Sequence, residues 1–275
     1  MSKLTVGSDL EFFVTSGSSM HAKSLIAGEV ICPFGKDDPR ELSYGRMHWD
    51  NVCIEICPEH ADNVDDFHKN VVQMMGAMTG DIAKAKCHMA RYASAYISQA
   101  LASSPSAQVF GCEPDLNAHT RKVQRPNAKS AGTLRTAGGH VHIGVETESM
   151  EDKILLTKLC DMYLGIPSVM LDDDTRRREL YGKAGSFRPK DYGIEYRTLS
   201  NYWALRDNTI KWIFEQVQEV VSVYEGMKVM QKEDSSGIDY DWMDGSVSAE
   251  IQEIINTGNR RKARAYIKAS NINMP

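Results

Sequence analysis

The chain has 275 residues, of which 42% are hydrophobic and 25% are charged, as in ordinary folded soluble proteins. One large domain is expected, because single cores split only above about 250–300 residues. The net charge of −5 argues against a broad nucleic-acid-binding surface but allows a local basic pocket for an anion. We find no apolar run of the roughly 18 residues that span a bilayer and no secretory leader. A cytoplasmic protein without a membrane partner is therefore expected.

The first half of the chain reads as strands followed by a helix. Apolar–polar alternation predicts strands over residues 4–14 and 46–57, with a turn at Gly17 and returning strands over 23–32. Apolar residues at three- and four-residue steps predict a helix over 61–101. Residues 107–118 are interpreted as a strand and turn. The polar, basic stretch 119–135 is interpreted as a mobile loop and candidate substrate lid.

The second half contains a strand over 139–146 and a helix that starts at a capping-box pattern, Ser149 to Asp152, and runs to about Leu171. A further strand surrounds Glu195, and apolar spacing predicts a helix over 207–231. A loop over 233–245 and one or two short helices complete the chain. We expect a single domain over 1–275, with a core of about 4–232 and a helical tail over 233–275.

Strands that alternate apolar and polar residues are half-buried, which is typical of antiparallel sheets. Here the polar faces carry many acids. The pattern predicts an α+β fold, in which a curved, mainly antiparallel sheet carries its helices on the outer face.

The most informative segment is Gly138 to Gly144, which reads Gly-Gly-His-Val-His-Ile-Gly. Because side chains alternate along a strand, His140 and His142 project from one face, about 6.6 Å apart. Val141 and Ile143 then face the core. A paired imidazole face at a strand end suits a metal ion or a polyphosphate.

Acidic side chains recur on other predicted strands. Asp9 and Glu11 share one strand face, Glu55 lies in an apolar run, and Glu195 shares a face with Arg197. Two carboxylates about 4 Å apart repel by about 4 kcal/mol at an effective dielectric of 20. Divalent cations remove this repulsion, and carboxylate oxygens suit Mg²⁺ or Mn²⁺, with one imidazole tolerated.

Together these segments resemble the glutamine synthetase and glutamate–cysteine ligase superfamily, and most closely its phage-encoded COOH.NH2 ligase type 2 group. The resemblance covers roughly residues 5–225. Its most characteristic parts are 178–203, which includes Gly-Ser-Phe-Arg-Pro and Ile-Glu-Tyr-Arg, and 110–118, Phe-Gly-Cys-Glu-Pro-Asp-Leu-Asn-Ala. One departure is Asp9, which stands where cellular relatives usually carry Glu.

The resemblance implies an active site on the concave face of the sheet. It implies an ATP-dependent ligase, which phosphorylates a small-molecule or peptide carboxylate and joins the resulting acyl phosphate to an amine. The implied metal ligands for Mg²⁺ or Mn²⁺ are Asp9, Glu11, Glu55, His140 and Glu195. The implied nucleotide-binding residues are His142, Arg178, Lys183 and Arg188. The implied catalytic residues are Arg188, Glu195 and Arg197, and Glu113 and Asp115 are candidates for binding the amine.

Two other functions stay open at this point. A metal-dependent hydrolase, either an amidase or a phosphoesterase, could use the same histidine and carboxylates to activate water, although the five basic residues between Arg176 and Arg188 favour a phosphate clamp. An inactive binding or structural protein could keep the fold. A P-loop and a Gly-x-Gly-x-x-Gly motif are both absent from the sequence.

The six cysteines show no Cys-x-x-Cys pair. Cys53 and Cys57 form only a weak zinc pattern, and all six are interpreted as reduced bystanders. The sequence leaves open whether the chain forms a homo-oligomer, and if the gene is phage-encoded the expected location is the host cytoplasm.

Overall fold

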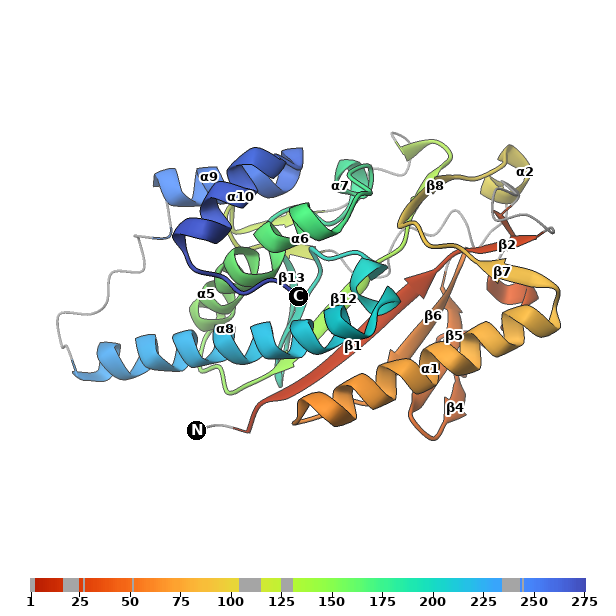
Figure 1. Cartoon of the computed structure of the whole chain (residues 1–275), viewed down its shortest axis with the longest axis horizontal. Helices are drawn as coiled ribbons and strands as arrows, with labels where there is room; N and C mark the ends of the chain where they lie inside the picture. Colours follow the sequence, from red (N-terminus) through yellow and green to blue (C-terminus); the bar gives the residue numbers. More distant parts are fainter. Residues whose placement is uncertain are drawn as a thin grey trace.

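The computed structural model describes residues 3–16, 25–26, 28–50, 52–103, 115–124, 131–233, 243 and 245–275. Within them the chain forms an antiparallel sheet of nine strands, with helices on one face (Figure 1). The α+β class with an antiparallel sheet is therefore confirmed. In spatial order the strands are β10 (Lys122–Gln124), β9 (Asp115–Asn117), β13 (Ser186–Lys190), β14 (Gly193–Tyr196), β12 (Gly139–Gly144), β1 (Thr5–Phe12), β6 (Cys53–Pro58), β5 (Gly45–Asp50) and β4 (Arg40–Leu42).

Smaller elements lie around this sheet. β2 (Val14–Ser16) pairs with β3 (Leu25–Ile26) and β7 (Cys87–Met89), and β8 (Ser94–Tyr96) pairs with β11 (Leu134–Thr136). The short helices are η1 (Gly28–Val30), α2 (Gln99–Ala102), α7 (Arg177–Leu180) and η3 (Asn201–Leu205).

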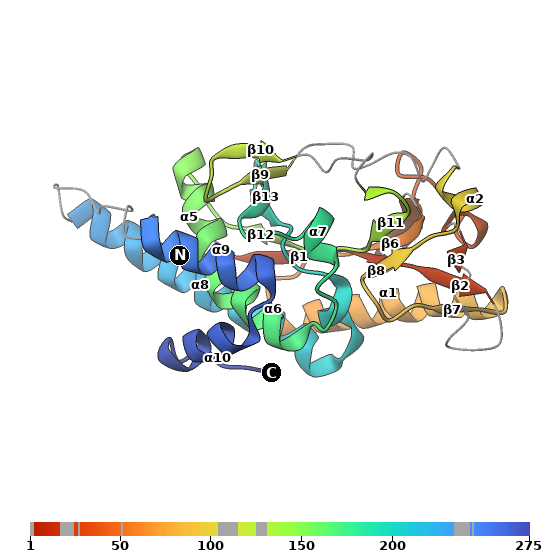
Figure 2. The same cartoon turned by 90° about the horizontal axis from the view of Figure 1, so that it is seen from above.

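Three long helices cover the apolar face of the large sheet: α1 (Val64–Lys84), α5 (Met150–Cys160) and α8 (Asp207–Glu233). The turned view of Figure 2 shows α1 and α8 on one side of the sheet and α7 on the other. The strands direct fully buried side chains toward these helices, among them Leu10, Val141 and Ile194. Period-two alternation then sends the neighbouring residues of each strand to the opposite face.

The segment Met150–Leu171 is a long helical stretch of apolar composition. It starts at the expected capping box of Ser149 and Asp152 and continues through a π-helical turn, η2 (Asp161–Gly165), into α6 (Ile166–Leu171). Its length and composition would allow it to span a membrane, contrary to the expectation from the sequence, but 78% of its apolar window is buried inside the protein. Burial in the core accounts for its composition.

The last two helices, α9 (Gly245–Thr257) and α10 (Arg260–Ala269), pack on α6 in a separate apolar cluster. A buried polar network also joins α9 to the sheet. The His119 ring nitrogens lie 2.7 Å from Ser248 Oγ and 2.7 Å from Asp161 Oδ2, and the Tyr196 hydroxyl donates to Asp161 Oδ1 at 2.7 Å. The network thus runs from α9 through η2 to the end of β14.

Three expectations about local structure are wrong. The helix expected over 61–101 ends at Lys84, because Lys86 adopts a left-handed backbone (φ 57°) that turns the chain into β7. The strand expected over 46–57 is a hairpin of β5 and β6 in which Asp50 pairs with Cys53. The segment expected to be a loop, 119–135, contributes β10 and most of β11 to sheets, and its residues 125–130 lie outside the described part.

Candidate active site

The sheet face opposite α1 and α8 gathers charged side chains from seven neighbouring strands. The register places Asp9 opposite His140 on β12, and Glu11 opposite Glu55 on β6. Glu195 on β14 lies between His142 and Arg188, its partners on the two flanking strands. These registers bring together charged residues that are up to 186 positions apart in the sequence, from Asp9 to Glu195. The face thus carries a charge gradient: acidic side chains lie at the β5–β6 end, and basic side chains lie at the β13–β14 end.

At one end, three carboxylates meet. One oxygen each of Glu11, Asp50 and Glu55 lies within 4.8 Å of the other two. Burial, with Glu55 and Asp50 nearby, raises the pKa of Glu11 to about 7, although Gly138 N donates to Glu11 Oε2 at 2.6 Å. Burial, together with Asp9 and Asp50, raises the pKa of Glu55 well above its ordinary value. Negative charge on Glu11 and Glu55 is thus unfavourable here, and a bound cation would stabilise it.

The middle of the face holds Asp9 and the two histidines. His142 Nε2 donates to Asp9 Oδ2 at 2.9 Å, and the Tyr192 hydroxyl lies 2.6 Å from His142 Nδ1. Burial opposes ionisation of Asp9, but the charge and hydrogen bond of His142 outweigh it and lower the pKa of Asp9. Asp9, His142 and Glu195 each place one donor atom within 4.8 Å of the others. This group could hold a metal ion.

His140 is more deeply buried than His142, at 5% exposure. Arg197 Nη1 donates to His140 Nδ1 at 3.0 Å, and Glu195 Oε1 lies 3.7 Å from the same nitrogen. Burial and the charge of Arg197 hold the pKa of His140 well below its ordinary value. The ring is therefore neutral, the state in which an imidazole binds a metal.

At the other end, cations surround Glu195. Arg197 Nη1 donates to Glu195 Oε1, Lys190 Nζ lies 3.0 Å from Oε2, and Arg188 Nη1 lies 3.6 Å from Oε1. Burial disfavours the charge of Glu195, but Arg197 foremost, followed by the two histidines and Arg188, lowers its pKa below the ordinary value. Arg197 Nε also lies 2.8 Å from Asp115 Oδ1, an ion pair without the alignment of a hydrogen bond. Glu195 is thus ionised and held in place.

Two cavities open on this face and meet at Asp9. A small cavity of about 70 Å³ is lined by residues from both the acidic and the basic end of the face, including Glu11, Glu55, His140 and Arg197. A larger cavity of about 440 Å³ lies beside His142 and Tyr192. Its volume falls within the range of small-molecule sites. The arrangement therefore offers a polar centre next to a space for a larger ligand.

The structure brings most of the expected site residues together. Those that converge on the face are Asp9, Glu11, Glu55, Asp115, His140, His142, Arg188, Glu195 and Arg197. Arg178 does not converge, because Arg178 Nη2 donates to Ser168 Oγ in α6 at 3.1 Å. Lys183 is exposed and lines none of the described cavities. Glu113 lies outside the described residues.

Three site residues were not expected from the sequence. Lys190 contacts Glu195, and period two from Arg188 along β13 would have identified it. Asp50 joins Glu11 and Glu55, but its position depends on the unrecognised hairpin. Arg177 lines the small cavity and donates to Thr198 O at 2.8 Å. Burial lowers the pKa of Arg177 to about 10.

Comparison with known proteins identifies the class first: a family model for carboxylate–amine ligases matches residues 72–239, more than half of the chain. The chain belongs to the phage phiEco32-like COOH.NH2 ligase type 2 family. The matched region contains the histidine pair, Arg188, Glu195 and Arg197, whereas Asp9, Glu11 and Glu55 precede it.

Among solved structures, a cryo-EM glutamine synthetase of Plasmodium falciparum is similar, with 9% sequence identity and a TM-score of 0.37. The similarity covers 79% of this chain and 52% of the glutamine synthetase chain, so the protein spans about half the length of that relative. No curated protein sequence matches the chain.

Proposed function

We propose that the protein uses ATP and divalent cations to join a carboxylate to an amine through an acyl phosphate. The observation that carries this proposal is the charge gradient across one sheet face. Carboxylates that favour cations lie beside arginines and a lysine that favour phosphate, with Asp9 and the histidines between them. Membership of a carboxylate–amine ligase family supports the same reading.

The donor set fits divalent metal ions. Glu11, Asp50 and Glu55 offer carboxylate oxygens, the donors that suit Mg²⁺ or Mn²⁺. We assign Glu11 and Glu55 to one ion and Asp9, His140 and Glu195 to a second. When bound, the ions would neutralise these carboxylates and the negative charge of the terminal phosphates of ATP. In this scheme His142 fixes Asp9 and lies at the edge of the larger cavity, where it can also contact a nucleotide phosphate.

The basic end has the chemistry for the phosphate in transfer. Arg188 lies on β13 and Arg197 directly follows β14. Both guanidinium groups lie against Asp115 and Glu195, which fix their orientation. Catalysis of phosphoryl transfer depends mainly on positioning and on charge neutralisation. We assign these two arginines to the transferring phosphate, with Lys190 as a third cation. Arg178 and Lys183 have no role in this scheme.

The amine substrate needs a carboxylate near the acyl phosphate. Asp115 lies at that end, and burial raises its pKa although Arg197 and Arg188 oppose the shift. An incoming ammonium group would replace part of the arginine contact with Asp115. The substrates are small molecules or peptides in this proposal, and the site of action is the cytoplasm.

The decisive experiment is a screen of carboxylate and amine pairs with purified protein, Mg²⁺ and ATP, with ADP and amide measured together. We expect stoichiometric ADP and amide, and loss of both in Glu195→Ala. Lys211→Ala, an exposed change on α8, serves as the matched control. Turnover without nucleotide would instead establish a hydrolase. Failure to bind Mg²⁺-ATP in calorimetry would establish an inactive scaffold.

A further inference from the structure

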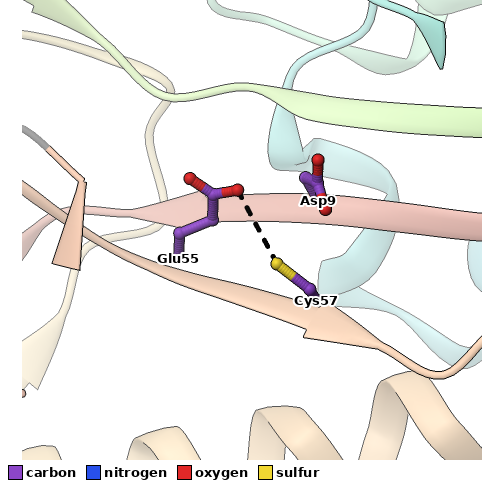
Figure 3. Close-up of side chains that lie close together, drawn as sticks. All are labelled: Asp9, Glu55 and Cys57. Atoms are coloured by element: carbon purple, nitrogen blue, oxygen red, sulfur yellow. Dashed lines mark hydrogen bonds between the residues drawn. The ribbon is translucent and has the colours of Figure 1, made fainter. Parts of the chain in front are cut away.

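A thiol lies inside the carboxylate face, and neither the proposed ligase reaction nor the preferences of magnesium explain it. Cys57 follows Glu55 by two positions on β6, so both side chains project from the same face. One donor atom each of Asp9, Glu55 and Cys57 lies within 4.8 Å of the other two. Figure 3 shows the three side chains around one common space, with Asp9 reaching in from β1.

One pair of these donors has a separation close to that in a tetrahedral zinc site. Cys57 Sγ lies 3.7 Å from Glu55 Oε1. In a tetrahedral site with Zn–S of about 2.3 Å and Zn–O of about 2.0 Å, the sulfur and oxygen are about 3.5 Å apart. The sulfur and the carboxylate oxygen are therefore already close to the separation that a shared ion requires.

An independent observation also points to a ligand. His48 on β5 is paired with Glu55 in the register and is only 2% exposed. Neither ring nitrogen of His48 has a hydrogen-bond partner among the described residues, and Nε2 lies 3.5 Å from Glu55 Oε2. A buried imidazole without hydrogen bonds is costly, because each desolvated polar group costs about 1–3 kcal/mol. A metal ion beside Glu55 would give this nitrogen a partner.

We propose that Asp9, Glu55 and Cys57, with His48 beside them, form a binding site for a thiophilic divalent ion, of which Zn²⁺ is the fitting example. The set contains oxygen and sulfur donors, and the His48 Nε2 nitrogen lies 3.5 Å from one oxygen of Glu55. Thiolate and imidazole select Zn²⁺ or Co²⁺ over Mg²⁺, which prefers oxygen ligands and retains water. One consequence rests on the proposed function: because Asp9 and Glu55 are shared, bound zinc would compete with magnesium and inhibit ligation.

The test is direct metal binding by the full chain, without nucleotide. Co²⁺ is the probe, since a cobalt ion bound to a thiolate shows a charge-transfer band in the near ultraviolet. We expect this band in the unmodified protein, its displacement by one equivalent of Zn²⁺, and its persistence in excess Mg²⁺. Cys57→Ser should remove the band and weaken Zn²⁺ binding at least tenfold. His48→Gln should weaken Zn²⁺ binding by a similar factor while the band remains.

Cys53→Ser is the matched control, because Cys53 is a buried thiol on the same strand that belongs to none of the described metal groups. The band should survive this change. Absence of the band in the unmodified protein, or its survival in Cys57→Ser, would overturn the proposal. Should Cys57→Ser not fold, Asp9→Asn must weaken Zn²⁺ binding and keep the band, and unchanged affinity there would equally overturn it. A chain that shows the cobalt band but forms no amide would contradict only the ligase proposal.

Discussion

The imidazole of His142 donates from Nε2 to the Asp9 carboxylate across the β1–β12 pair, at 2.9 Å. The register alone would set His140, not His142, directly opposite Asp9. Both histidines are thus related to the same carboxylate: His140 is its cross-strand partner, and His142 is its hydrogen-bond donor. Their roles can be separated by experiment.

The first prediction compares His140→Asn with His142→Asn. If His140 is the metal ligand, His140→Asn should weaken Mn²⁺ binding by about tenfold or more and abolish ligation. His142→Asn should mainly raise the KM for ATP, because His142 borders the larger cavity. Calorimetry with Mn²⁺ and initial rates at several ATP concentrations measure the two effects. A reversed pattern would move the second ion from His140 to His142.

The second prediction concerns pH. In the metal-free protein, burial and the neighbouring acids Glu55 and Asp50 raise the pKa of Glu11 to about 7. A metal ion must therefore displace a proton from Glu11. Mg²⁺ affinity should therefore rise as pH increases from 6 to 8, by up to about tenfold per unit below the pKa. Calorimetry in two buffers of different ionisation enthalpy should detect proton release at pH 6.5.

The same linkage has a defined sign for stability. A carboxyl group with a raised pKa in the folded state contributes stability below its unfolded pKa, and this contribution is lost as pH rises through about 7. Mg²⁺ should therefore raise the melting temperature more at pH 8 than at pH 6. The variant Glu11→Gln should release fewer protons on binding Mg²⁺, and an unchanged release would contradict the assignment.

The third prediction is that Arg197→Gln damages both rate and stability. Arg197 is the buried partner of Glu195 and Asp115, and removing one member of a buried ion pair costs about 3–5 kcal/mol of unfolding free energy. Loss of a cation at the transferring phosphate should lower kcat by about 10³-fold or more. Urea unfolding and single-turnover ADP release measure the two effects.

Arg260→Gln is the control for that change, because it removes an exposed guanidinium that pairs with Asp173 at 2.7 Å. Its effect on stability should stay within about 0.5 kcal/mol. An Arg197→Gln variant with an equally small effect on both rate and stability would show that this buried pair is not part of the machinery.

The fourth prediction uses two glycines. A Cβ at Gly138 would lie 2.3 Å from His140 Nε2, so Gly138→Ala must displace the imidazole. We expect Gly138→Ala to lose most activity, with a fold still visible by circular dichroism. Gly76→Ala is the matched change in α1, where a Cβ would meet nothing within 4 Å. It should keep activity and stabilise the protein by about 0.5–1 kcal/mol.

Local alternation was sufficient to predict the main strands and their faces. Val141 and Ile143 are fully buried and the histidines lie on the opposite face, as period two requires. The α8 helix and the capping box at Ser149 were likewise predictable, because their patterns are short in sequence range. These elements are determined by interactions between residues that are close together in the sequence.

What could not be predicted depends on contacts between distant segments. The hairpin of β5 and β6 reads as one alternating run, so the proximity of Asp50 to Glu11 was hidden. Arg177 and Arg178 are adjacent and chemically alike, and only the packing of α7 decides that Arg177 faces the cavity and Arg178 faces α6. Motif order identified the strands of the site but not which of these two arginines faces the cavity.

The polar network through His119 connects α9 to β14, the strand that carries Glu195. Ser248 lies in the last part of the chain, yet only two side chains, His119 and Asp161, separate it from the Tyr196 hydroxyl. A fragment that ended before α9 would expose Ile166 and Val169 to solvent. It would also remove Ser248, the hydrogen-bond partner of His119 Nδ1. Truncation before α9 should therefore lower the activity, although it removes none of the residues assigned to the site.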